Sequence, residues 1–480
     1  MEPDTNTEDE QKTQLKKFTK GYTFKILMLI AMLLILLIPL AMIRGLINDR
    51  HRTAQIAEAG IMEAWGSELV AVGPVLVVPG VRTVATRTWV ALDGGGREER
   101  GTTVEHRFSM AIMPRELDIC ADLSTEVRRR GIFSVPLFSG ELSFSGAFDA
   151  ALAADSLASD ETLLFDQAEL VIALSNQKGI RRIERALWDT GGAENGRELF
   201  FQPGNRGLEV VSRGLVVGPM APIATTGAGI FAAIQDFDGG EAAFDISISM
   251  QGGRMVRFLP SGQQTHVRIS SDWGSPSFQG SFLPGASEIT DEGFSATWDI
   301  SYLSRDIPLF WMETETRTRQ DFSHSLFGVN FFRAIDTYSL NTRATRYAVL
   351  FLIVPFLTMF LLEVHTRKRI HPVQYLLSGI ANVVFYLLLL SFSEQMHFHL
   401  AYLIAALAVA TLLTLYSRSL LPTWGKSVYM AVAVSVSYIL LYAVLNAESF
   451  ALLIGSVFTF ALVALVMFLT RNMNWYGSEE

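Results

Sequence analysis

Few residues in this sequence have side chains suited to catalysis or metal binding. The single cysteine, Cys120, could act as a nucleophile, but we expect it to be a small buried apolar residue. Glu394, His397 and His399 could bind a metal ion, although polar residues also gather at the level of lipid headgroups. The patterns HExxH and GxSxG are absent. We therefore predict no catalytic residue and no metal site, which means that the chain is not an enzyme.

Two glycine-containing stretches resemble nucleotide-binding patterns without meeting their requirements. Gly425-Lys426-Ser427 matches the end of a phosphate-binding loop, but position 420 is leucine where that loop needs glycine. Residues 227–232 (GAGIFA) fit a dinucleotide fingerprint, but they lie in a region without alternating strands and helices. We expect a flexible loop at this position and no cofactor.

Two clusters of residues in the middle of the chain, one of arginines and one of aromatic residues, could each have either a structural or a binding role. Arg128, Arg129 and Arg130 precede an apolar run and could contact a partner or an anion such as a lipid phosphate or an acidic glycan; a solvated edge is the alternative. A second cluster combines aromatic residues with tight turns, which is typical of a β-domain core, with a binding groove as the alternative. Its members are Trp273, Pro276, Phe278, Phe282 and Trp298.

The composition indicates a membrane protein, in which membrane-spanning segments position the residues named above. Of the 480 residues, 50% are hydrophobic and only 18% are charged, whereas soluble domains carry about 25% charged residues. The apolar residues concentrate in 24–43 and 346–470. The net charge of −9 argues against nucleic acid as a partner, because nucleic acid requires a clustered basic surface. A single cysteine excludes an intrachain disulfide, so a domain outside the cytoplasm must be stabilised by its core alone.

Six apolar segments are long enough to cross a bilayer. The first, residues 24–43, lacks a convincing cleavage site and is therefore an uncleaved anchor rather than a signal peptide. The other five lie within 346–471. Their predicted bounds are 347–362, 373–392, 400–416, 428–445 and 450–470.

Positive charges next to the spans predict their orientation, because lysine and arginine stay on the cytoplasmic side. Lysines precede the first span, and residues 365–371 carry Arg367, Lys368 and Arg369, whereas residues 393–399 carry no lysine or arginine. Both termini are therefore predicted in the cytoplasm, and the segment between the first two spans outside it. The cytoplasmic tails are 1–23 and 472–480.

The segment 44–345 reads as a large β-rich domain of the sandwich or barrel-like kind, inserted between spans one and two. Short runs rich in Val, Ile, Phe and Thr recur between glycines and prolines, and residues 244–250 alternate between apolar and polar types. Residues 92–101 predict a hairpin tip or loop, and residues 49–65 predict a helix continuing the first span. Two lobes divided near 190–205 are an open possibility.

Polar residues within the spans follow helical spacings of three or four, so those on one span share a face. We predict that they pack helices together through hydrogen bonds, with a substrate path as the alternative. No lysine, arginine or acid occupies the centre of a span, which argues against an ion or proton relay. The predicted packing residues are Ser378, Asn382, Tyr386, Glu394 and Asn446.

A series of motifs, in order along the chain, resembles the CreD family of bacterial inner-membrane proteins, named for cell envelope integrity. The motifs are WG at 65–66, GPVLVVP at 73–79, RGIF at 130–133, DWGSPSFQGSFLP at 272–284, GFSATW at 293–298, RYAVLF at 346–351 and the long block 371–407. The resemblance covers residues 45 to 420. It implies a Gram-negative inner-membrane location and expression under a two-component system that responds to envelope or wall stress. It implies no reaction, because none is established for the family.

The resemblance and the predicted topology together indicate an inner-membrane protein of the envelope stress response. We expect it to maintain envelope integrity through a non-catalytic binding or interaction domain in the periplasm. The alternative is a transporter, or a protein that handles lipids or wall precursors, with the periplasmic domain as substrate vestibule. The expected partners are the phospholipid bilayer and an unknown envelope component or membrane protein.

Overall fold

A computed structural model of the chain describes residues 22–91, 97–175, 177–191, 196–204, 229–313, 323–331, 337–366, 369–420, 424–447 and 450–471. The chain divides into two compact units. Helices form the first unit, Met1–Gln55 with Ile335–Glu480, and strands form most of the second, Ile56–Ala334. The predicted tail 472–480, most of the tail 1–23, and the loop residues Arg367 and Lys368 lie outside the described part.

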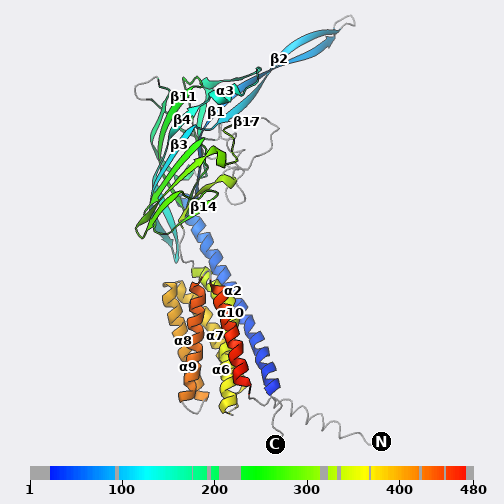
Figure 1. The fold of residues 1–480 in the computed structure, drawn as a ribbon, viewed down its shortest axis with the longest axis vertical. Coiled ribbons are helices and arrows are strands. Elements are labelled where there is room, and N and C mark those ends of the chain that lie inside the picture. Colours follow the sequence, from blue (N-terminus) through cyan, green and yellow to red (C-terminus); the bar gives the residue numbers. More distant parts are fainter. Residues whose placement is uncertain are drawn as a thin grey trace, which may run out of the picture. The chain divides into compact units, whose positions relative to one another are not determined.

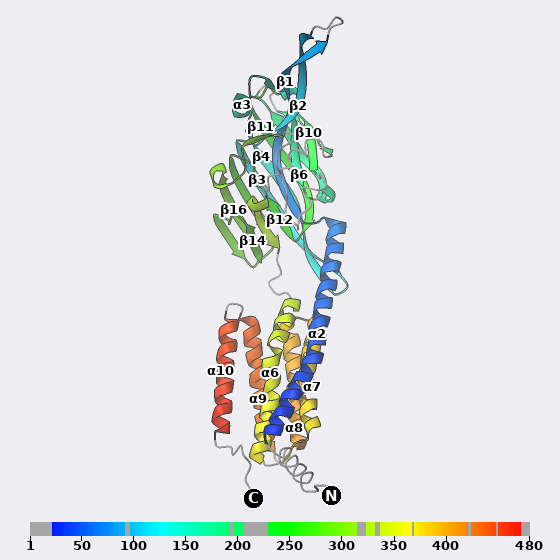
Figure 2. The same cartoon turned by 90° about the vertical axis from the view of Figure 1, so that its right-hand side faces the viewer.

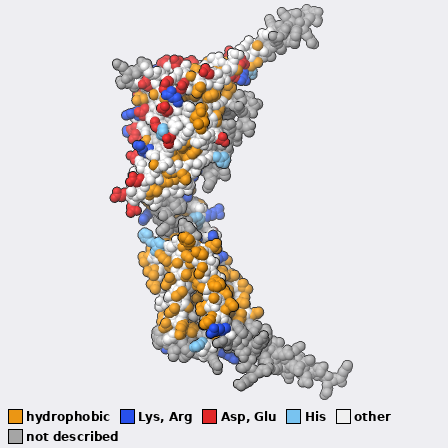
Figure 3. Space-filling model, in the orientation of Figure 1, with side chains coloured by type: hydrophobic (Ala, Val, Ile, Leu, Met, Phe, Trp, Pro, Cys, Tyr) orange, Lys and Arg blue, Asp and Glu red, His pale blue; other side chains and the backbone are white. Residues whose placement is uncertain are grey.

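Six helices of the described chain are long and apolar enough to cross a membrane, as predicted. Figures 1 and 2 show them as a bundle, and hydrophobic side chains cover the face of the bundle seen in Figure 3. The expected fold, six spans with a β-rich domain after the first, is confirmed. The helices are α2 (Tyr22–Trp65), α6 (Thr337–Thr366), α7 (Pro372–Ser393), α8 (Phe398–Leu420), α9 (Trp424–Asn446) and α10 (Ala451–Thr470).

Helix α2 is longer than the predicted span 24–43, because the predicted helix over 49–65 continues it without a break. This continuation contains four alanines and two glutamates, which favour helices. The helix ends at Trp65, and the next residue, Gly66, has φ +150° and donates its N–H to the Met62 carbonyl at 2.8 Å. A Cβ at Gly66 would collide with the Gln251 carbonyl, so glycine is required at this close approach.

Two β-sheets form the second unit, together with the short helix α3 (Ala151–Asp155). The ten-stranded sheet contains β1 (Leu69–Ala91), β2 (Arg97–Ile112), β5 (Glu161–Leu163), β6 (Glu169–Leu174), β9 (Gln202–Pro203), β10 (Gly229–Ala233), β12 (Met255–Phe258), β14 (Pro276–Gly280), β17 (Phe310–Glu313) and β18 (Phe327–Phe331). The eight-stranded sheet contains β3 (Glu116–Arg130), β4 (Phe133–Asp149), β7 (Ile180–Asp189), β8 (Arg197–Glu198), β11 (Glu241–Gly253), β13 (Gln264–Ser271), β15 (Ala286–Thr290) and β16 (Gly293–Ser301).

The two sheets share one hydrophobic core and so form a sandwich. Along β3, burial alternates with a period of two, so that Leu117 and Ile119 enter this core while their neighbours face outward. The predicted alternation in β11 is present, with Phe244 and Ile246 in the core. A smaller cluster around Val70 packs on the other face of the ten-stranded sheet.

Neither sheet divides at the predicted boundary near 190–205. Strand β11 pairs with β4 and β7, and β12 pairs with β1, so strands from both sides of that boundary share each sheet. The described strands therefore give one domain rather than two lobes in series. Its limits as a compact unit, Ile56–Ala334, lie inside the predicted 44–345, because α2 continues beyond the first span and α6 begins at Thr337.

The predicted aromatic cluster belongs to the core. Trp298 is 2% exposed, and its indole Nε1 donates to the Phe282 carbonyl at 3.1 Å. The Phe278 ring meets both the Phe294 and Trp298 rings edge to face. Edge-to-face contacts of this kind favour an ordered core.

A long antiparallel ribbon extends from the sandwich (Figures 1 and 2). Strands β1 and β2 pair continuously from Leu76 with Ile112 to Ala91 with Arg97. Of the predicted hairpin tip 92–101, residues 97–101 belong to strand β2, so the prediction of a loop is wrong there, and residues 92–96 lie outside the described part.

Candidate functional site

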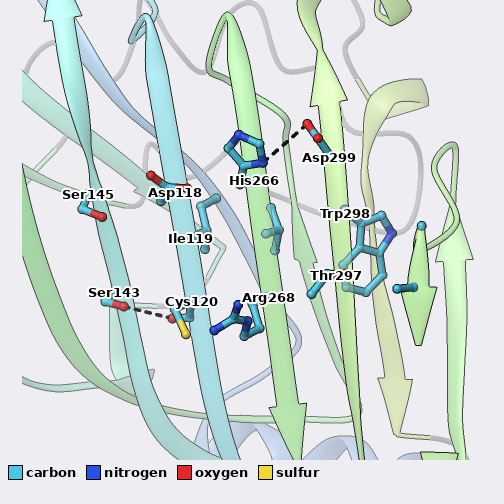
Figure 4. A pocket seen from close by; sticks show the side chains of 13 residues that line it. Asp118, Ile119, Cys120, Ser143, Ser145, His266, Arg268, Thr297, Trp298 and Asp299 are labelled. Atoms are coloured by element: carbon cyan, nitrogen blue, oxygen red, sulfur yellow. Dashed lines mark hydrogen bonds and ion pairs between the residues drawn. The ribbon is translucent and has the colours of Figure 1, made fainter. Parts of the chain in front are cut away.

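A polar groove crosses the outer face of the eight-stranded sheet (Figure 4). Its hollow has a volume of about 590 Å³ and lies over four neighbouring strands, β4, β3, β13 and β16, with Ala286 of β15 at its edge. The polar residues that line it alternate along each strand with core residues, so their side chains point away from the core.

The polar side chains of the groove form two rows across the strands, because residues in register on neighbouring strands lie side by side. The rows are one strand pleat apart and carry acids, a histidine, an arginine and small hydroxyl residues. They consist of Ser145, Asp118, His266 and Asp299, and of Ser143, Cys120, Arg268 and Thr297.

The charges of the groove are only partly neutralised within the chain. His266 Nδ1 lies 3.4 Å from Asp299 Oδ1, which also accepts a hydrogen bond from Gln264. Asp118 and Arg268 form no ion pair or hydrogen bond with any side chain of the described residues. The groove therefore presents one uncompensated carboxylate and one uncompensated guanidinium to solvent.

Cys120 lies exposed in this groove, and the prediction that it would be buried is wrong. Its neighbours Ile119 and Ala121 occupy the inward positions of β3, so the cysteine must point outward. Partial burial raises the pKa of the Cys120 thiol, and the nearby charge of Arg268 only partly opposes this effect. A nucleophilic cysteine needs a lowered pKa, so the groove does not activate this thiol.

The structure gives different roles to the three predicted contact arginines, all of which lie at the exposed end of β3. The Arg128 guanidinium stacks 3.6 Å from the centroid of the Trp65 ring, and its Nε lies 3.2 Å from Glu126 Oε1. Arg130 Nη1 lies against Gly60 of α2. Arg129 is exposed and stays the candidate for an anionic contact.

The end of α2 is fastened to the eight-stranded sheet by a cluster around Trp65. Arg181 of β7 also lies over the Trp65 ring, with its guanidinium carbon 5.5 Å from the ring centroid. Gln251 of β11 donates to the Trp65 carbonyl and accepts a 2.6 Å hydrogen bond from Arg181 Nε. Partly desolvated cation–π contacts contribute about 1–2 kcal/mol each, so Arg128 stabilises the helix–sheet contact.

In the helical unit, Asn382 of α7 connects three helices. Its Nδ2 donates to the Phe351 carbonyl of α6 at 3.1 Å, and its Oδ1 accepts from the Tyr438 hydroxyl of α9 at 2.7 Å. The Tyr402 hydroxyl of α8 donates in turn to the Tyr438 carbonyl at 2.6 Å. These buried hydrogen bonds link α6, α7, α8 and α9, which is the arrangement expected of polar packing.

The other predicted packing residues differ in what they contact. Ser378 is buried and bonds the Gln374 carbonyl of its own helix, and Asn446 is exposed and bonds the Tyr442 carbonyl of its own helix. Tyr386 is buried, and its hydroxyl has no hydrogen-bond partner. Glu394 contacts two other helices, since Arg50 Nε of α2 lies 3.7 Å away and the Tyr338 hydroxyl of α6 donates to it at 3.2 Å.

One buried charge network was not predicted from the sequence. Glu363, near the end of α6, forms an ion pair with Lys25 of α2 and accepts a 2.7 Å hydrogen bond from the Tyr375 hydroxyl of α7. Lys25 also reaches the Ile370 carbonyl at 3.5 Å. The only sequence signal was a single acid at the end of an apolar run, and its partner lies more than 300 residues away.

Among the described residues, no group of three or more metal-binding side chains lies close enough to bind one ion. Glu394, His397 and His399 therefore do not form such a group. His399 instead contacts the Tyr442 hydroxyl through Nδ1 at 2.9 Å. The stretch 229–232 belongs to strand β10 rather than to the predicted loop, and residues 227–228 lie outside the described part. A dinucleotide fingerprint needs these residues to open a helix, whereas residues 229–232 form a strand.

Comparison with known proteins covers both units. The sequence model of the family described as "Inner membrane protein CreD" matches residues 21–476. The chain belongs to the CreD family. It is 28% identical to the "Inner membrane protein CreD" of Escherichia coli (strain K12) over 456 residues, which cover 95% of this chain and 94% of that protein. The resemblance seen in the sequence motifs is thereby confirmed.

Membership of the CreD family and six apolar helices together make this chain a multi-pass inner-membrane protein. The family match runs through the strands of the groove as well as through the spans. A function that belongs to the whole chain must therefore account for both units.

Replacing Asn382 by leucine is expected to destabilise the helical unit by about 1–2 kcal/mol, because two interhelical hydrogen bonds are lost together. The measurement is unfolding of the full chain in bicelles by a denaturing detergent, followed by circular dichroism. Asn446→Leu is the matched control, because Asn446 bonds only within its own helix and should cost less than about 0.5 kcal/mol. Equal losses for the two variants would contradict the assigned role of Asn382.

Proposed function

We propose that this protein maintains cell envelope integrity by binding an envelope component or a partner in its β-rich domain, without catalysis. The observation that carries the proposal is the groove on the eight-stranded sheet, in which Asp118 and Arg268 stand uncompensated beside a hollow of about 590 Å³. Small-molecule sites occupy hollows of roughly 300–1,000 Å³ with a few well-placed polar groups. The family name supports a role at the inner membrane.

Binding is favoured over hydrolysis because of the state of the one thiol in the groove. Hydrolysis through Cys120 would need a base that lowers its pKa, whereas partial burial raises the pKa of this thiol. His266, the histidine of the groove, pairs with Asp299 on β16. The polar groups therefore suit recognition of a ligand by charge and hydrogen bonds.

The alternative, transport through the helices, is supported by buried polar atoms that lack partners in the described part of the helical unit, namely the Tyr386 hydroxyl, Asn341 Oδ1, the Ser427 hydroxyl and His51 Nδ1. Against it, the polar groups of Tyr402, Tyr438 and Asn382 are bonded directly to one another and to the Phe351 carbonyl. Groups already bonded to one another are poor ligands for a passing substrate. Polar packing is the better account of these bonds.

The function can be tested in bacteria that lack their own copy and are challenged with an antibiotic that acts on the cell wall. The full chain should restore survival, and Ser143→Trp, which fills the groove, should accumulate normally but fail to restore it. Ser159→Trp, on an exposed turn, is the matched control and should restore survival fully. Asn382→Leu should also restore survival if it accumulates. Full rescue by Ser143→Trp together with no rescue by Asn382→Leu would favour transport instead.

We also propose that the β-rich domain lies in the periplasm and both termini in the cytoplasm, on the basis of the positive charges beside the spans. A reporter enzyme that is active only outside the cytoplasm should work when fused at Gly204 or His397. It should be inactive when fused at Lys368. Activity at Lys368, with inactivity at Gly204, would reverse the proposed orientation.

A further inference from the structure

The two uncompensated charges of the groove are placed so that one small ligand can reach both. Arg268 of β13 lies opposite Cys120 of β3, and Asp118 is two residues before Cys120 on the same strand. Diagonal neighbours on adjacent strands are about 7–8 Å apart, and Arg268 forms no ion pair with Asp118 across this gap. The gap is instead the right size for a ligand with opposite charges at its two ends.

The surroundings give the groove a negative row and a positive row. Asp299 lies in the same row as Asp118, on the other side of His266, so an ammonium group there would meet two carboxylates. Thr297 lies next to Arg268 in the same row and offers a hydroxyl donor beside the guanidinium. Ser143 lies on the other side of Cys120, and its hydroxyl donates to the Cys120 carbonyl at 3.3 Å. A carboxylate is the group that best matches a guanidinium with a neighbouring hydroxyl.

We propose that the groove binds a short peptide by its ammonium group at Asp118 and its carboxylate at Arg268. This inference deepens the proposed function and rests on the same groove. An extended chain spans about 3.4 Å per residue, so the charges of a free dipeptide lie about 7 Å apart. The hollow crosses about 14 Å of sheet, which leaves room for side chains. The indole of Trp298 faces the core, so the groove does not offer its ring as a platform for a sugar.

The single cysteine provides a direct measurement on the full chain in detergent micelles. Because Cys120 lies in the second row of the groove, a bound peptide should slow its modification by a maleimide. The thiol pKa is raised, so labelling is carried out above pH 8. Millimolar dialanine with free termini should slow labelling at least threefold. Acetyl-dialanine amide, which has the same chain without the charges, should have no effect, and tetraalanine should protect less than dialanine.

Two variants test the assigned contacts. Arg268→Gln and Asp118→Asn should each abolish protection by dialanine. Arg107→Gln, which removes an exposed guanidinium from β2 in the other sheet, should preserve it. Protection is taken for each protein as the ratio of labelling rates without and with peptide, because Arg268 itself affects the thiol.

The inference is overturned if dialanine gives no protection, or if the capped peptide protects equally well. Its failure can be separated from failure of the proposed function by the survival assay. If dialanine gives no protection but Ser143→Trp still fails to restore survival, the groove remains the functional site and only the peptide ligand is rejected. Charge-dependent protection together with full survival of Ser143→Trp would establish the peptide site and reject its role in envelope integrity.

Discussion

Phe327→Ala should lower the free energy of unfolding of the β-rich domain by about 4 kcal/mol, a large part of the 5–15 kcal/mol typical of a domain. Phe327 of β18 is fully buried, and its ring lies 5.6 Å from that of Trp298 and 6.0 Å from that of Phe282. Truncation to alanine removes these contacts and leaves a cavity between the sheets. The measurement is pulse proteolysis of the full chain in urea, following the fragment that contains the domain.

Phe200→Ala is the matched control, because the Phe200 side chain is 81% exposed. The same atoms are removed without opening a cavity, so the change should stay within about 0.5 kcal/mol. Similar losses for Phe327→Ala and Phe200→Ala would show that the sandwich core does not stabilise the domain in the way described.

Glu363→Met should destabilise the helical unit by about 3 kcal/mol, the lower end of the usual cost of removing one partner of a buried ion pair, because the Lys25 side chain is 19% exposed. The substitution leaves the Lys25 ammonium and the Tyr375 hydroxyl without their acceptor at the junction of α2, α6 and α7. Lys25→Met should have an effect of similar size, because it leaves the Glu363 carboxylate without its cation. Unfolding in bicelles by a denaturing detergent, followed by circular dichroism, measures both.

The double variant Lys25→Met with Glu363→Met distinguishes a broken ion pair from a general packing defect. Replacing both charges by apolar groups removes the unpaired charge, so most of the stability lost in each single variant should return. Additive losses in the double variant would mean that the two side chains act independently. Glu363→Gln should fall between wild type and Glu363→Met, since it keeps an acceptor for Tyr375.

The spans could be predicted from the sequence because each is a continuous apolar run, and length and composition alone identify such runs. The β-sandwich was recognisable from alternating runs such as 244–250, but the pairing of strands was not. Strand β1, for example, is continuous from Leu69 to Ala91, and its partners β12 and β6 lie far along the chain. No local pattern encodes pairing at such separation, which explains why a division near 190–205 could be considered.

The sequence contained a pattern that indicates which residues of β3 face the groove, and the prediction of a buried Cys120 did not use it. In the run Leu117 to Leu123, apolar residues hold every odd position and Asp118, Cys120 and Asp122 every even one. Period-two alternation therefore placed Cys120 with the aspartates on the outer face. Arg128 is a different case, because its contact with Trp65 depends on where α2 ends relative to β3, which the sequence does not state.

The pairing of β1 with β12 has a consequence for biosynthesis. Leu69 pairs with Val256, and Glu116 of β3 pairs with Gln264 of β13, so each sheet joins early and late parts of the chain. At about 5–20 residues per second, the ribosome needs roughly 10–40 s to make the 190 or so residues between Leu69 and its partner. During that interval the nascent β1 and β3 each have one edge without its parallel partner. Exposed edges of this kind invite pairing with other chains, so the nascent domain should depend on a chaperone until residue 271 has emerged.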